Sequence, residues 1–175
     1  MRRLAASLYE ALLLGALALA LGLVLLLLTG PRATAANHLL AVPRPAERAI
    51  SFACLIAALG AYCIWLWSDG RRSLPMRTWG LVLTTAAGGT VSPWLAGLRY
   101  LAAWTGPACA VAAYLVLRPY GHRRWAAALL AINYAWALVD RDGRFLHDRL
   151  AGTRLMRAAA PSRPAPTVAA EPPLP

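Results

Sequence analysis

The sequence predicts an all-α membrane protein with about four transmembrane helices, both termini in the cytoplasm and a disordered, proline-rich C-terminal tail. Apolar residues make up 59% of the 175-residue chain and charged residues only 14%, which leaves too few polar side chains to cover a soluble globule. The basic residues are all arginine, and they gather at the ends of the apolar runs, where lipid headgroups lie. The net charge of +11 therefore indicates a bilayer with anionic headgroups as the partner, and no nucleic acid.

Four apolar segments approach the length that a spanning helix needs, about 17 to 25 residues. They cover about residues 4–28, 49–67, 98–117 and 125–139. The third contains Gly106-Pro107, where we expect a kink whose freed carbonyl is satisfied by a neighbouring helix or by water. The fourth has only fifteen residues, so it either crosses a thin region of the bilayer or lies at the interface.

The N-terminal segment has two interpretations. Arg2 and Arg3 precede the apolar run and "ATA" at 33–35 resembles a cleavage site, as in a signal peptide. The run is longer than the 7–15 residues typical of a signal core, and Glu10 interrupts it, so a retained helix is favoured. With four spans and a cytoplasmic N-terminus, twelve arginines lie inside and six outside, which agrees with the positive-inside rule.

The remaining segments differ in composition. Residues 29–48 form a short outer loop, and in the inner loop 69–97 the sequence "WGLVLTT" followed by "AAGG" predicts a strand and a glycine turn. Residues 140–157 read as a charged interfacial helix, with Phe145, Leu146, Leu150 and Leu155 facing the membrane. Residues 158–175 are rich in proline and alanine, which predicts a disordered tail.

Motifs for catalysis and for cofactors are missing from the sequence. There is no glycine-rich phosphate loop, no nucleophile elbow and no HExxH motif. The three histidines have no partner at the spacing of metal ligands. We therefore expect no enzymatic activity, no catalytic residue, no cofactor and no bound metal.

The most informative residue is Glu10, because an acid within an apolar helix is costly and is usually paired or functional. Seven helical steps separate it from Arg3, which returns to nearly the same face about two turns away. Arg3 and Glu10 could pair with each other, or both could reach a third group such as Arg99. Three interpretations follow: a structural ion pair, an ion or proton site, or a glutamate that snorkels to the interface.

Three stretches carry a resemblance to a known family. The sequences "RRLAASLYEALLL", "MRTWGLVLTTAAGGTVSPWLAGLRYL" and "DRDGRFLHDRLAGTRLM", in this order, resemble the RDD family of bacterial membrane proteins, named for one arginine and two aspartates. The resemblance implies a transmembrane domain over residues 2–157, with the family arginine at Arg3 and the two acids at Glu10 and Asp148. Glu10 stands where the family often has Asp, and the middle loop lacks the charges that many relatives carry.

The resemblance implies a small multi-pass protein of the cell inner membrane, for which transport of unidentified ligands has been suggested. Two functional hypotheses follow. In the first, the protein transports an ion or small solute with Glu10 as the binding group and Arg3 or Arg99 as its partner; we expect a homo-oligomer, since four short helices enclose little space. In the second, it is an accessory or scaffold membrane protein, in which the charges of Arg3, Glu10, Arg99 and Asp148 fix helix packing.

Overall fold

The structure is a computed structural model that describes residues 2–29 and 44–158. Its elements follow in the order α1 (Arg2–Thr29), α2 (Pro45–Trp67), α3 (Leu74–Thr78), β1 (Leu81–Thr85), α4 (Pro93–Ala103), α5 (Thr105–Leu117), η1 (Arg123–Ala131), α6 (Ile132–Ala135), η2 (Trp136–Leu138), α7 (Leu146–Leu150) and β2 (Thr153–Arg157). The outer loop and the tail that the sequence predicts lie mostly outside the described residues. The predominantly helical fold agrees with the predicted class.

Three helices of the described part are long and apolar enough to cross a membrane: Arg2–Leu28, Pro45–Trp67 and Pro93–Leu117. Leucines along α1 are strongly exposed, as expected for a surface that faces lipid; Leu19 and Leu28 are each 78% exposed. The third of these helices begins at Pro93, earlier than the predicted residue 98. Ser92 explains this start, because its side chain accepts a hydrogen bond from the backbone N–H of Leu95 and Pro93 suits the first helical turn.

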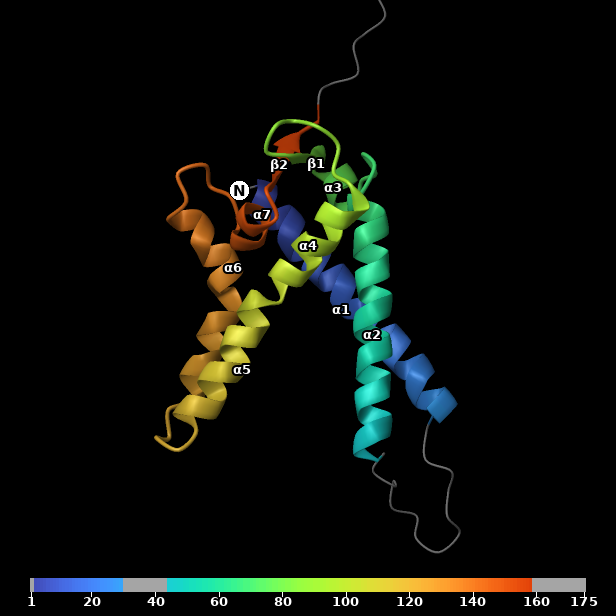
Figure 1. The fold of residues 1–175 in the computed structure, drawn as a ribbon, viewed down its shortest axis with the longest axis vertical. Helices are drawn as coiled ribbons and strands as arrows, with labels where there is room; N and C mark the ends of the chain where they lie inside the picture. Colours follow the sequence, from blue (N-terminus) through green and yellow to red (C-terminus); the bar gives the residue numbers. More distant parts are fainter. Residues whose placement is uncertain (1, 30–43, 159–175) are drawn as a thin grey trace, which may run out of the picture.

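The third helix is broken where the sequence predicts a kink. The chain turns at Trp104, between α4 and α5, and the two helices diverge in direction (Figure 1). Pro107 has no N–H to donate to the carbonyl of Ala103. The side-chain amide of Asn133 donates to that carbonyl instead, at 2.7 Å. A neighbouring helix therefore satisfies the freed group, as expected.

The fourth apolar segment is helical but divided into the three short pieces η1, α6 and η2. It runs back alongside α5, and the two form an arm at the lower left of Figure 1. Gly106 allows the close approach, because a Cβ at this position would lie 3.0 Å from the carbonyl oxygen of Leu130. Whether this segment crosses the bilayer stays a prediction.

A small two-stranded sheet lies at the opposite end from this arm, together with α3, α7 and the start of α1 (Figure 1). The predicted strand is present as β1, and it pairs antiparallel with β2 so that Leu83 faces Leu155. The glycine turn is also present, with Gly88 at φ +90°.

The predicted interfacial helix over 140–157 is wrong. Only Leu146–Leu150 is helical; Gly152, at φ +63°, follows the helix, and the chain then forms β2. Phe145 and Leu155 do not face lipid but are buried, each 3% exposed, whereas Leu150 is exposed. The alternation in "TRLMR" places Thr153 and Leu155 on the inner face of a strand. This period of two residues is typical of a strand and not of a helix.

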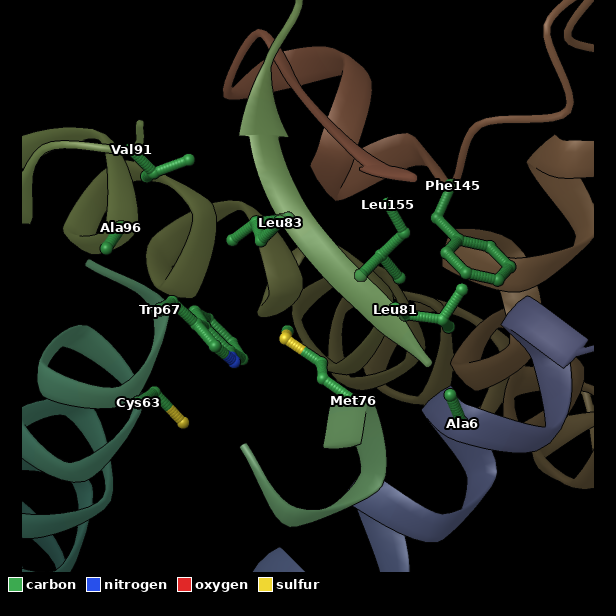
Figure 2. Close-up of a cluster of buried hydrophobic side chains, with 10 residues drawn as sticks. All are labelled: Ala6, Cys63, Trp67, Met76, Leu81, Leu83, Val91, Ala96, Phe145 and Leu155. Carbon is green, nitrogen blue, oxygen red and sulfur yellow. The ribbon is translucent and has the colours of Figure 1, made fainter. Parts of the chain in front are cut away.

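The sheet, α2, α3 and α4 enclose the main cluster of buried apolar side chains. Figure 2 shows Trp67, Met76 and Leu83 converging from α2, α3 and β1. Ala6 brings α1 into the same cluster and Phe145 brings the segment before α7. The core thus lies at the end of the molecule that holds both the start of α1 and the end of β2, and the candidate site is built against it.

Candidate functional site

Glu10 contacts the C-terminal end of α2. The indole N–H of Trp67 donates a hydrogen bond to its Oε1 atom at 2.9 Å. Trp67 is buried in the core, whereas Glu10 is partly accessible. Within residues 2–29 and 44–158, no ion pair to Glu10 is found. Its carboxylate is therefore held by a neutral donor.

The same indole also contacts Arg99, which α4 places on its face. The guanidinium carbon of Arg99 lies 4.2 Å from the centroid of the Trp67 ring, a cation–π contact. The carboxylate of Glu10 and the guanidinium of Arg99 thus meet one aromatic ring, the first at its N–H edge and the second at its π face. Arg99 also lies within electrostatic range of Glu10.

Arg99 forms its ion pair with Asp148 of α7. The Nε atom of Arg99 donates to Oδ1 of Asp148 at 2.7 Å, and the two side chains are 2% and 3% exposed. The hydroxyl of Thr153, at the start of β2, donates to the same oxygen at 3.4 Å. Removing two charges from water is costly, and the short charge-assisted hydrogen bond offsets part of that cost. This pair holds α4 against the C-terminal segment.

His147 completes the buried group. Its Nε2 atom lies 3.3 Å from Nη2 of Arg99, and its ring stacks on Phe145 with the centroids 5.6 Å apart. Since a guanidinium only donates, Nε2 must be the acceptor and His147 must be neutral. Burial lowers the pKa of His147 to about 4, with Arg99 acting in the same direction and Asp148 opposing it, which agrees with a neutral ring at pH 7.

Arg3 lies at the rim of this end of the molecule and is exposed. Its guanidinium donates to the backbone carbonyl of Asp142 at 3.4 Å, and no hydrogen bond or ion pair to Glu10 is found in the described ranges. The structure therefore does not bring Arg3 and Glu10 together as a pair. Arg3 instead joins the start of α1 to the loop before α7.

That loop has its own ion-pair cluster around Asp140. Asp140 accepts hydrogen bonds from the backbone N–H of Arg144 at 2.9 Å and from the side chain of Arg149 at 2.9 Å. The hydrogen bond from Arg144, assisted by the nearby guanidinium groups of Arg149 and Arg144, lowers the pKa of Asp140 below its usual value. The cluster fixes the turn that leads into α7.

Of the four predicted site residues, Arg99 and Asp148 are in direct contact, Glu10 joins them through Trp67, and Arg3 lies apart. Sequence reasoning missed Trp67, His147 and Thr153. Trp67 ends an apolar run, and its partner Glu10 is 57 positions away, so no local spacing could indicate the contact. His147 and Thr153 lie near Asp148 in "HDRLAGT", within one of the three stretches that resemble the family.

The model of the RDD family matches residues 1–152. This chain belongs to the RDD family. The match includes Glu10, Trp67, Arg99 and Asp148, and it ends immediately before β2. As an RDD family protein, the chain is a membrane protein with apolar membrane-spanning helices, in agreement with the described structure. No curated protein and no solved structure matches the chain.

Proposed function

We propose that this RDD family protein is a multi-pass protein of the cell inner membrane that transports a cation or a proton, with Glu10 as the group that binds it. The observation that supports this is that the carboxylate of Glu10 has no ion-pair partner in the described residues. Its only hydrogen bond in the described part is from the neutral indole of Trp67, and Arg99, whose charge acts on Glu10, is already paired with Asp148. A partly buried carboxylate without an ion-pair partner attracts a cation or a proton.

The neighbours of Glu10 suit reversible binding. Trp67 holds one carboxylate oxygen, so the side chain has a defined position. The positive charge of Arg99 discourages permanent occupation by a cation, because it repels any cation that approaches Glu10. We propose that the protein acts without enzymatic chemistry and as a homo-oligomer, in which the path for the ion lies between protomers, because so few helices enclose little space.

Flux in proteoliposomes tests this proposal. The wild-type protein is expected to move protons or a monovalent cation down an imposed gradient, and Glu10→Gln is expected to abolish this flux, because an amide neither exchanges a proton nor carries a charge. Glu47→Gln is the matched control. Glu47 is also a helical glutamate, but it lies in the first turn of α2 and accepts a hydrogen bond from the backbone N–H of Arg44. Equal flux in wild type and Glu10→Gln would overturn the proposal.

An accessory or scaffold role is the second candidate. The observation that favours it is the buried pair of Arg99 and Asp148, which fastens α4 to the segment containing α7 and β2. In this case Glu10 supports the packing of α1 on α2 through Trp67. The wild-type protein would then show no flux, and Glu10→Ala, which removes the acceptor for the indole N–H of Trp67, would weaken the fold.

A further inference from the structure

The arm formed by α5 and η1 contains a groove far from Glu10. Its volume is about 550 Å³, within the range of small-molecule sites. Most of its lining is apolar and comes from both helices, including Pro107, Ala110, Tyr114, Ala127 and Leu130. A groove of this composition suits a hydrocarbon chain.

Two arginines complete the lining of the groove. Arg123 and Arg124 both belong to it, and both are exposed. Arg118 and His122 stand in the same turn between α5 and η1. The sequence contains no Asp or Glu from residue 70 to residue 139, and no ion pair involves these arginines in the described part of the chain. The turn therefore carries a positive charge that no acidic side chain of the described residues neutralises.

Exposed aromatic side chains indicate that this turn lies at headgroup depth. Tyr120 and Trp125 are 72% and 64% exposed, as is typical of side chains at a membrane–water interface. The guanidinium of Arg124 lies 5.8 Å from the centroid of the Trp125 ring, which holds the cation beside this aromatic residue. The groove thus extends from the headgroup region along α5 toward the hydrocarbon.

We propose that this groove binds an anionic phospholipid, whose phosphate lies between Arg123 and Arg124 and whose acyl chain lies against Ala127 and Leu130. The charges of the two arginines favour a phosphate group, and the apolar walls favour an acyl chain. A free phosphate ion has no acyl chain to occupy these walls. Arginines on the predicted outer side also run against the positive-inside rule, so topology does not explain them. The site is independent of the transport that we propose for Glu10.

Lipid titration of the full-length protein in detergent, followed by native mass spectrometry, tests the site. We compare dioleoyl phosphatidylglycerol with dioleoyl phosphatidylcholine, which has the same chains and no net charge. The wild-type protein is expected to prefer phosphatidylglycerol. Replacing both Arg123 and Arg124 by Gln is expected to raise the apparent dissociation constant for this lipid about 30-fold, since each arginine near a membrane surface contributes a factor of about five. The control is Arg2→Gln with Arg77→Gln, two exposed arginines at the other end of the molecule.

A third variant tests the contribution of the apolar groove separately from that of the arginine charges. Ala127→Phe fills the groove from an exposed position and leaves both arginines in place, so it is expected to weaken phosphatidylglycerol binding several-fold. Unchanged phosphatidylglycerol binding in this variant would overturn the site in favour of nonspecific charge attraction. So would a control variant that loses as much affinity for phosphatidylglycerol as the variant without Arg123 and Arg124. Competition by inorganic phosphate as effective as that by the lipid would also overturn it. Unfolding temperatures without added lipid show that each variant is folded.

Discussion

Arg99 and Asp148 are deeply buried charged side chains, and their pairing is the strongest constraint at the residue scale. Asp148→Asn would leave the guanidinium of Arg99 without its counter-charge. We expect the free energy of unfolding to fall by about 3–5 kcal/mol. Denaturant unfolding in detergent measures this.

Asp142→Asn provides the comparison for that change. Asp142 also pairs with an arginine at 2.7 Å, Arg144, but its own side chain is 66% exposed. An exposed pair contributes about 0–1 kcal/mol, so this variant is expected to unfold almost as the wild type does. Equal losses in the two variants would show that the Arg99–Asp148 contact is not buried in the protein.

His147 gives the fold a pH dependence of known sign. Its pKa is lowered to about 4 in the folded protein, from the usual value of about 6.5. Between these values the unfolded chain binds a proton that the folded protein does not. The contribution of His147 to stability is therefore fully present above about pH 6.5 and decreases as the pH falls toward about 4. Between about pH 7.5 and about pH 5.5 we expect His147 to account for a loss of about 1 kcal/mol.

Unfolding of wild type and His147→Gln at the two pH values isolates this contribution. The variant cannot bind the proton, so its stability is expected to change less over the same interval. The same pH dependence in both proteins would show that His147 is not buried as a neutral ring.

At the scale of elements, the contact between Asn133 and the α4–α5 break is the most testable. Asn133→Ala leaves the carbonyl of Ala103 without its donor, which is expected to cost about 1–3 kcal/mol. In a Pro107→Ala background the restored N–H of residue 107 can serve that carbonyl, so the same substitution is expected to cost less. Unfolding of the four proteins of this double-mutant cycle measures the difference. Strictly additive losses would contradict a role for Asn133 as the substitute donor.

The sequence predicts these elements unequally well. Long apolar runs predict α1, α2 and the helix containing Pro107, because length in a membrane is set by bilayer thickness. The strand β1 was predicted from its β-branched residues and glycine turn. The strand β2 is not predicted. The arginines in "TRLMR" are typical of an interfacial helix as well as of a strand with one solvated face. Only the pairing of Leu155 with Leu83 decides between the two.

The candidate site shows the same limit. The sequence singles out Glu10 and Arg99 as charges near the membrane boundary, and the family resemblance adds Asp148, but neither predicts which of these residues pair. The contact over 49 positions depends on how α4 packs on α7, and the contact over 57 positions depends on how α1 packs on α2; no local periodicity predicts either. Trp67 in particular has an unremarkable place at the end of an apolar run.

At the scale of the whole molecule, the start of α1 and the end of β2 lie at the same end (Figure 1). Reporter fusions after Arg72 and after Arg157 are therefore expected to report the cytoplasm, and a fusion near His38 the outside. This expectation follows from the arginine distribution and requires an even number of crossings, including the segment from η1 to η2. Because β1 follows Arg72 and pairs with β2, which ends at Arg157, a fusion after Arg157 that reports the outside would contradict this pairing as well as the crossing of the segment from η1 to η2.

The central claim, that Glu10 binds a cation or proton and is not merely a packing residue, is tested most directly by measuring flux and unfolding on one preparation of Glu10→Gln. Gln can still accept the hydrogen bond from Trp67, so the contact between α1 and α2 is retained. We predict a free energy of unfolding within about 1 kcal/mol of the wild-type value, because the neutral hydrogen bond is kept. We also predict loss of flux in proteoliposomes in which the wild-type protein is active. A destabilised variant alongside an inactive wild type, or a stable variant with full flux, would contradict the claim.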